Sequence, residues 1–244
     1  MKETDAIFAH IAAARERAAA DPFCLRTSID TKAKVKIGLF SRRGKSRLPK
    51  PAADHDMDPD AILVPFGVLE VSRGAEKIQQ LNVLFGHSRE TSDFIVDGLT
   101  LWWLSRREHH PGVRRLMIEL DNGPEISSAR TQFLKRMVQF ADETGLEIEL
   151  VYLPPYHSKY NPIERGWGVL EQHWNGAILD TIETALEWAR TMSWRGVKSL
   201  VYEIKTTYER GVKLTRTAMR PIFERLQRDS ALPKWSLVIS PKSG

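Results

Sequence analysis

Apolar residues recur with helical spacing at the start of the chain and with strand spacing directly after it. Residues 4–20 are rich in alanine and repeat apolar positions every three to four residues, which predicts a helix that begins at Thr4. Residues 25–40 alternate apolar and polar positions, which predicts two strands of a hairpin that turns near residues 31–33. A third strand is expected at residues 62–71.

Helical and strand patterns alternate through the rest of the chain. The predicted elements are a short strand or an irregular segment at 77–85, a helix at 88–106 capped by Ser88, a strand at 113–120, a helix from Ser127 or Ser128 to Gly145, a strand at 146–153, a helix from Asn161, a helix at 181–194 capped by Thr181, helices at 199–208 and 215–226, and a loosely specified tail at 231–244. This order predicts an α/β fold whose mixed sheet has an antiparallel three-strand meander followed by parallel strands, with helices on its faces.

The composition is that of a soluble globular protein. The chain has 244 residues, of which 42% are hydrophobic and 27% charged, enough to bury one good core or at most two small ones. No apolar run is long enough for a transmembrane helix and no secretory signal pattern is present, so we expect a cytoplasmic protein without a membrane partner. The single cysteine, Cys24, excludes an internal disulfide and argues against a structural zinc site.

Charge is distributed unevenly along the chain. Residues 26–50 hold nine Lys and Arg against one Asp, and residues 190–228 hold ten against three Glu. Between these two basic segments, residues 51–99 are acidic, with nine Asp and Glu against three Lys and Arg. Basic segments beside acidic ones suit a polyanion held near a carboxylate site, although solvated faces of ordinary elements would give the same counts.

A stiff turn and the start of a helix follow the strand at 146–153. Pro154 and Pro155 keep the chain extended before the turn, because proline fixes its own φ and disfavours helix at the preceding residue. Asn161 is then expected to cap a helix with a proline at its first position and Glu164 three residues after the cap. Glu164 either closes a capping box with Asn161 or serves chemistry.

Two further carboxylates are expected at the same edge of the sheet. Asp121 stands at the carboxyl end of its strand, where ligands bind in open α/β sheets, and the proline turn returns Glu164 to that edge. Asp30 lies on the first strand, where an inward charge needs a partner or a metal. Each has an alternative: Asp121 begins an Asp-Asn-Gly-Pro sequence that favours a turn. The other acids that compete with Asp30 are Asp54, Asp56 and Asp97.

Three carboxylates brought together repel one another unless a cation neutralises them. Such oxygen ligands suit Mg²⁺ or Mn²⁺, and two ions about 3.5–4 Å apart activate the attacking oxygen and stabilise the leaving oxygen of a phosphodiester. Glu171, seven residues after Glu164, is a candidate supporting acid, and the pair His109 and His110 is a weaker candidate for metal ligands. The sequence has no P-loop, no G-x-S-x-G and no H-E-x-x-H motif.

The combination of IELDNG at 118–123, LPPY at 153–156 and NPIERGW at 161–167 resembles the DDE transposases of bacterial insertion sequences. The stretches SIDTK at 28–32 and ADETGLEI at 141–148 narrow the resemblance to the Rhodopirellula-type transposase family. This likeness implies a ribonuclease H-like fold. We therefore expect an N-terminal helix at 1–20, a ribonuclease H-like DDE catalytic core at 21–178 and a C-terminal helical extension at 179–244.

The resemblance also implies a site and an activity. Asp30, Asp121 and Glu164 match the three metal-binding acids of the family, and the third comes 43 positions after the second. The implied function is DNA cleavage and strand transfer with Mg²⁺ or Mn²⁺, two ions in number, on transposon ends and target DNA in the bacterial nucleoid, by a homo-oligomer. The alternatives are a hydrolytic nuclease on the same scaffold and a degenerate fragment that only binds DNA or a partner.

The expected DNA contacts are basic residues near these acids. Family members usually carry an N-terminal helix-turn-helix region, whereas only one predicted helix precedes Asp30, so we expect a catalytic portion that does not recognise specific ends by itself. Contacts to the DNA backbone would weaken with salt and carry little sequence information. The candidates are Lys32, Lys34, Arg42, Arg43, Lys45, Arg47, His157 and Lys159.

Overall fold

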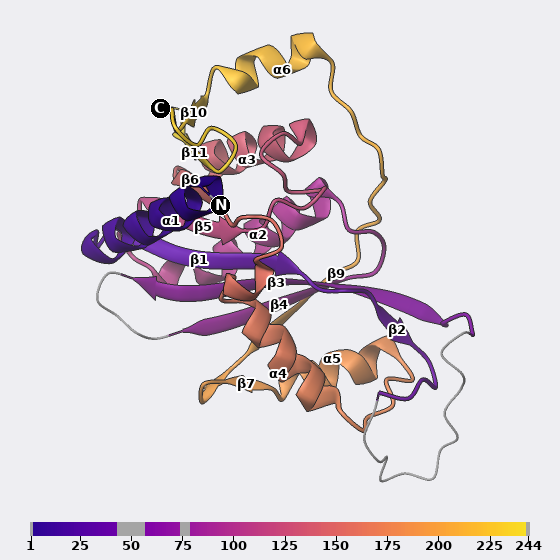
Figure 1. Cartoon of the computed structure of the whole chain (residues 1–244). Coiled ribbons are helices and arrows are strands. Elements are labelled where there is room, and N and C mark those ends of the chain that lie inside the picture. Colours follow the sequence, from indigo (N-terminus) through magenta and orange to yellow (C-terminus); the bar gives the residue numbers. More distant parts are fainter. Residues whose placement is uncertain (1, 43–56, 74–78, 243–244) are drawn as a thin grey trace.

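The computed structural model describes residues 2–42, 57–73 and 79–242 (Figure 1). Its helices are α1 (Lys2–Ala20), α2 (Ser92–Arg106), α3 (Thr131–Thr144), α4 (Glu164–Trp174), α5 (Ile182–Arg190) and α6 (Arg216–Phe223), with 3₁₀ turns η1 (Arg107–His109) and η2 (Ser158–Tyr160). Its strands are β1 (Cys24–Thr31), β2 (Val35–Ile37), β3 (Ala61–Arg73), β4 (Gln80–Gly86), β5 (Arg115–Leu120), β6 (Glu147–Tyr152), β7 (Ser193–Trp194), β8 (Val197–Lys198), β9 (Leu200–Ile204), β10 (Leu226–Arg228) and β11 (Ser236–Ile239). Within these ranges no helix is both long and apolar enough to cross a membrane.

One large sheet runs through the molecule in the order β10-β11-β6-β5-β1-β3-β4-β9. Strands β1, β3 and β4 form an antiparallel meander. Strand β5 lies parallel to β1, and β6 lies parallel to β5. An antiparallel meander continued by parallel strands, with helices on both faces, confirms the predicted ribonuclease H-like α/β fold.

The predicted hairpin within residues 25–40 is wrong. Strand β1 pairs with β3 up to Thr31 opposite Phe66, and β2 pairs with the same strand further along, with Val35 opposite Leu63. The backbone N–H of Lys32 donates to the carbonyl of Pro65, so the chain continues along β3 instead of turning back. Alternating apolar positions indicate strands but not their partners, and the meander is completed by β4.

Two predictions for the C-terminal part of the chain are also wrong. Residues 200–204 form strand β9, parallel to β4, where a helix was expected. The expected tail contains β11, which pairs antiparallel with β6. A short apolar run does not distinguish helix from strand by its periodicity, and here both strands cover edges of the sheet that would otherwise be unpaired. The division of the chain at residue 178 stays a prediction.

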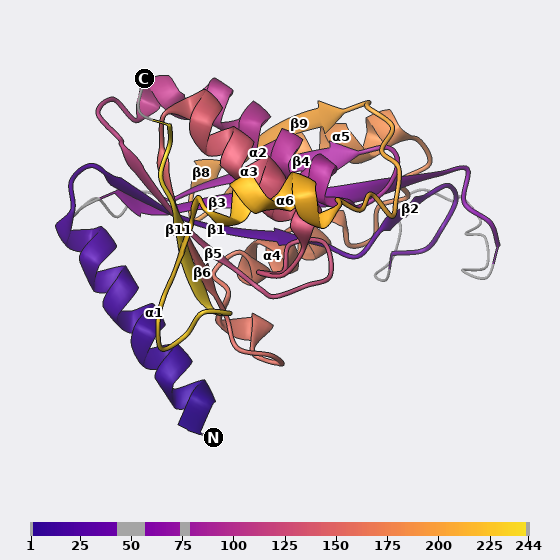
Figure 2. The same ribbon diagram turned by 90° about the horizontal axis from the view of Figure 1, so that it is seen from above.

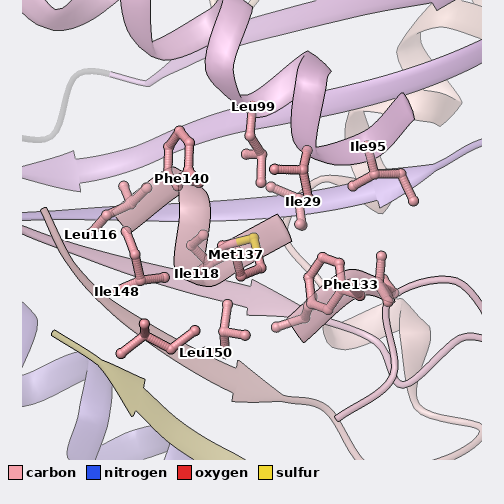
Figure 3. Close-up of a cluster of buried hydrophobic side chains, with 14 of the residues drawn as sticks. Ile29, Ile95, Leu99, Leu116, Ile118, Phe133, Met137, Phe140, Ile148 and Leu150 are labelled. Atoms are coloured by element: carbon pink, nitrogen blue, oxygen red, sulfur yellow. The ribbon is translucent and has the colours of Figure 1, made fainter. Parts of the chain in front are cut away.

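Helices α2 and α3 cover one face of the sheet and enclose the main hydrophobic core (Figure 3). Leu99 of α2 and Met137 of α3 meet Ile29 and Ile118 of the central strands, and all four side chains are fully buried. Ile29 lies on β1 next to Asp30, so this packing fixes the position of the strand that carries Asp30. Trp102 of α2 is buried in the same core.

The opposite face is shared by α1, α4 and α5 (Figures 1 and 2). Helix α4 packs Leu170 and Trp174 on the β3 and β4 side. Helix α1 lies on the β5 and β6 side, where Arg15 and Arg26 of β1 both bond the carboxylate of Glu119, whose side chain is only 1% exposed. A buried carboxylate needs such paired cations.

Helix termini follow the expected chemistry in some places and depart from it in others. Gly145 ends α3 in the left-handed conformation with φ 70°, and Thr181 caps α5 by accepting the N–H of Thr184, both as predicted. Helix α2 is capped by Thr91 and not by Ser88, since the Thr91 hydroxyl accepts the N–H of Phe94 at 3.1 Å. Helix α5 ends at Arg190, earlier than expected.

Candidate active site

Asp30 lies near the end of β1, and Asp121 directly follows the end of the neighbouring parallel strand β5. Strands β1 and β5 pair in parallel, with Ser28 opposite Glu119. Asp30 and Asp121 each come two residues later, and β5 ends at Leu120, directly before Asp121. Side chains alternate along a strand and paired strands lie about 4.8 Å apart, so both carboxylates lie on the same face at the carboxyl edge of the sheet.

The start of α4 is attached to β1 through Asn161 and Ser28. The Asn161 side-chain amide donates to the carbonyl of Ile29 at 3.0 Å, and its amide oxygen accepts the hydroxyl of Ser28. Ser28 Oγ in turn accepts the backbone N–H of Ile163 at 3.0 Å. All of these groups are buried. They hold the first turn of α4, and with it Glu164, against the strand that carries Asp30.

Asn161 does not cap α4, so the predicted cap is wrong and the capping-box alternative for Glu164 fails with it. The helix begins at Glu164, after Ile163 at the N-cap position, which makes no side-chain cap. The backbone N–H of Asn161 donates to Ser158 at 2.7 Å and is therefore not available to Glu164. The sequence signals for a cap are local, whereas the partner of Asn161 lies 133 positions away, at Ser28.

Trp167 connects α4 directly to Asp30. Its indole N–H donates to Asp30 Oδ2 at 2.9 Å, while the ring is 5% exposed. Trp167 therefore both packs in the core and bonds Asp30. Gly67, opposite Asp30 on β3, makes room for this ring, because a Cβ there would stand 2.7 Å from Trp167 Cη2 and 2.5 Å from Ile163 Cδ1.

Burial raises the pKa of Asp30 to about 7, against the hydrogen bond from Trp167, and the charges of Asp121 and Glu164 add to the rise. Burial also raises the pKa of Asp121, opposed by a hydrogen bond from the N–H of Gly123. The charges of Asp121 and Glu164 therefore both act on Asp30. Desolvated, mutually repelling carboxylates are stabilised by a cation placed among them.

The donor set fits a hard divalent ion. Asp30, Asp121 and Glu164 offer carboxylate oxygens, the ligands that Mg²⁺ and Mn²⁺ prefer. Among the described residues, no three or more His, Cys, Asp and Glu side chains are close enough to hold a metal ion as they stand. The two observations are consistent, because charges interact over longer distances than those of coordination.

Two of the competing residues, Asp97 and His110, have other partners. Asp97 accepts hydrogen bonds from Arg136 and from the Tyr208 hydroxyl. His110 contacts Glu70 at 2.9 Å in a buried cluster on the other face. Asp54 and Asp56 lie outside the described residues. Glu171, the candidate supporting acid, pairs with Lys32 at 2.6 Å.

A basic groove begins beyond the end of β1. It has a volume of about 550 Å³ and lies between residues 32–42 and the C-terminal half of α4. Lys32, Lys34 and Arg42 line it, together with Glu171. Lys32 is 15% exposed and is held by Glu171, whereas Lys34 is exposed.

Among the other predicted DNA contacts, Arg42, His157 and Lys159 lie within the described residues. The Arg42 guanidinium donates to the carbonyl of Lys36 and lies 5.4 Å from a ring centroid of Trp174, and burial lowers its pKa. His157 and Lys159 lie in the turn between β6 and α4, where Lys159 is exposed. Arg43, Lys45 and Arg47 lie outside the described residues.

Solved structures with some likeness to the chain are complexes of the Mos1 transposase. The Mos1 strand transfer complex has 12% identity and a TM-score of 0.48 over 77% of this chain and 52% of that one. The paired-end complex with the left transposon end has 14% identity and a TM-score of 0.46 over 73% and 50%. The mariner paired-end complex with Mn has 15% identity and a TM-score of 0.46 over the same shares. This chain spans about half the length of each.

Comparison with protein families gives a match over nearly the whole chain. A comparison with curated proteins found no match. The family described as "Rhodopirellula transposase DDE domain" matches residues 1–241, which include both strands of the site and all of α4. The chain therefore belongs to the Rhodopirellula transposase DDE domain family.

Proposed function

We propose that this chain is the catalytic domain of a DNA transposase that cleaves phosphodiester bonds and transfers the freed strand to a target. One observation carries the proposal: Asp30 on β1 and Asp121, directly after the parallel strand β5, each come two residues beyond the pair Ser28 and Glu119, and the helix of Glu164 is bonded to the strand of Asp30. The three acids come from three separate elements, and buried contacts at Asn161 and Trp167 direct them to one edge.

DDE transposases use divalent metal ions, and we assign the ligands here to Asp30, Asp121 and Glu164. Two ions of Mg²⁺ or Mn²⁺, when bound, would supply positive charge at the attacking and leaving oxygens of the phosphodiester. The protein supplies the rest. The Trp167 indole orients Asp30, and the Gly123 N–H orients Asp121. In this proposal the side chains move closer together once a cation relieves their repulsion.

The basic groove supports a path for the DNA backbone. It extends from the residues just after Asp30, so a strand lying in it would pass beside the proposed site. Lys34 offers an exposed charge, and Arg42 offers a planar guanidinium that is already held in place by the Lys36 carbonyl. The Lys32–Glu171 pair has to open before Lys32 contacts a phosphate.

Calorimetric titration with Mn²⁺ tests the metal site first. Wild type is expected to bind Mn²⁺, and Asp121→Asn is expected to lose that binding, because the change removes one negative charge from the ligand set without changing its size. Glu187→Gln, an exposed acid on α5, is the matched control and should bind like wild type. Equal binding by wild type and Asp121→Asn would refute the metal site.

A strand-transfer assay with pre-cleaved DNA ends tests the reaction. Joined products that require Mn²⁺ or Mg²⁺ and disappear in Asp121→Asn are expected from a transposase. Cleavage without any joined product would instead indicate a hydrolytic nuclease on the same scaffold. DNA binding with neither cleavage nor joining would indicate a chain that only binds DNA.

A further inference from the structure

An aromatic pocket lies beside the proposed site, between α1 and the turn after β6. It has a volume of about 210 Å³ and is lined by Phe8, Ile11, Arg15, Leu153 and Tyr160. Three residues of α1 thus meet a turn about 150 positions later. None of these five residues belongs to the proposed metal site.

The floor of the pocket adjoins Asp121. The backbone N–H of Leu153 donates to the carbonyl of Leu120 at 2.8 Å, and Asp121 is the next residue of that strand. Leu153 therefore stands beside Asp121 as β5 and β6 end in parallel. A group that filled the pocket would lie next to a phosphodiester held at the carboxylates.

The walls of the pocket are aromatic. The Phe8 ring lies 5.2 Å from the Tyr160 ring and 5.3 Å from His157, in edge-on geometry. His157 and Tyr160 are stacked, with their centroids 5.9 Å apart. Tyr160 is still 50% exposed, so its ring offers surface that the protein itself does not cover. Such rings are the surfaces on which nucleic-acid bases stack.

Positive charge accompanies these rings. Lys159 Nζ lies 5.2 Å from the Tyr160 centroid, and the Arg15 side chain forms part of the wall while its Nε donates to Glu119 at 3.2 Å. A purely apolar partner would gain nothing from these cations. A nucleotide presents a planar base and an attached phosphate, which match an aromatic pocket with cations around it.

We infer that the aromatic pocket binds one unpaired nucleobase of the DNA strand, next to the phosphodiester at the carboxylates. The inference rests on the proposed function and adds the position at which the DNA duplex opens. A space of this size holds a single ring system and not a base pair. The DNA must therefore be unpaired at this position, and the stacking energy of the bound base offsets part of the cost of unpairing.

Two DNA probes test the inference: a blunt duplex, and the same duplex with one unpaired 2-aminopurine nucleotide at its 3′ end. Affinity is measured by fluorescence anisotropy of a distant dye in EDTA, and stacking by the 2-aminopurine emission. Wild type is expected to quench the 2-aminopurine and to bind this probe between about 5-fold and about 150-fold more tightly than the blunt duplex, from the usual strength of base stacking. Tyr160→Ala should lose both effects and still bind the blunt duplex.

Conservative variants separate stacking from folding. Tyr160→Phe keeps the ring and should keep the preference, whereas Phe8→Leu keeps the apolar volume without the ring and should lose part of it. Trp188→Ala, a half-exposed aromatic residue on α5, is the matched control and should behave like wild type. Quenching and preference that persist in Tyr160→Ala would overturn the inference alone. Failure of wild type to bind either probe would overturn the proposed function and the inference with it.

Discussion

Replacing Gly67 with alanine tests whether the contact between α4 and the sheet positions the carboxylates. Gly67 lies opposite Asp30 on β3, and a new methyl group would stand 2.5 Å from Ile163 Cδ1 and 2.7 Å from Trp167 Cη2. Neither atom has room to move far, because Ile163 and Trp167 are both buried. The first turn of α4 must therefore shift away from β1 and β3.

The expected cost has two parts. Overfilling a packed site costs about 1–3 kcal/mol, and a shift of Trp167 that breaks its bond to Asp30 adds about 1.5–3 kcal/mol, the usual value for a hydrogen bond to a charged group. With a urea dependence of about 3 kcal/mol per molar, the first part alone lowers the unfolding midpoint by about 0.3–1 M. Mn²⁺ affinity should fall as well, because Glu164 moves with the helix.

Gly168→Ala is the matched control for this change. Gly168 lies on the same helix, but nothing stands within 4 Å of a Cβ built there. Alanine should therefore raise stability by about 1 kcal/mol through helix propensity alone. Ile163→Val combined with Gly67→Ala removes the closest clash and should recover part of the lost stability. A Gly67→Ala protein with the unfolding midpoint and Mn²⁺ affinity of wild type would refute the packing argument.

Three further predictions concern other parts of the molecule. Hydrogen bonds to the Glu70 carboxylate outweigh its burial and hold the pKa of Glu70 at about 2. The ionised side chain therefore stabilises the fold by about 3 kcal/mol above its ordinary pKa, and this stabilisation is lost as pH falls from about 4.5 to about 2. In urea unfolding, Glu70→Gln should lose less stability than wild type over this pH range, and an equal loss would contradict the assignment. Asn161→Ala should lower the free energy of unfolding by about 1–3 kcal/mol, because it leaves buried groups unpaired. The control Asn175→Ala, at an exposed position, should change it by less than about 0.5 kcal/mol. Equal urea midpoints of the two variants would contradict the role assigned to Asn161. Lys34→Ala should lower the slope of log Kd against log salt by about 0.9 for DNA, and the exposed Lys205→Ala should not; equal slopes would place the DNA elsewhere.

The sequence was sufficient for the central strands and for the helices with strong periodicity. Strands β1, β3, β5 and β6 and helices α1, α3 and α5 were all expected close to where they occur. Pairing was harder to predict, since the alternation that marks β2 as a strand does not show that it continues along β3. Strands β9 and β11 were missed because their identity comes from the sheet edges that they cover, which are not local in sequence.

The assignment of the three acids to a metal site stays a prediction, and the contacts around them were not predicted. Asp30, Asp121 and Glu164 follow from strand ends, a turn and a family resemblance, which are all visible along the chain. The bonds of Asn161 to Ser28 and of Trp167 to Asp30 join residues 133 and 137 positions apart. Pairings at such distances depend on the finished fold, so no local rule indicates them.

The start of α4 is attached to the sheet without any use of the Glu164 carboxylate. In a capping box the Glu164 carboxylate would accept the backbone N–H of Asn161, but that N–H already donates to the carbonyl of Ser158. The helix is held instead by the Asn161 amide, the Ser28 hydroxyl and the Trp167 indole, which together reach β1 on both sides of Ile29. Orientation and chemistry are therefore divided between different residues. A change at Asn161 should move Glu164 without altering its charge, while a change at Glu164 itself should alter charge and leave the helix in place.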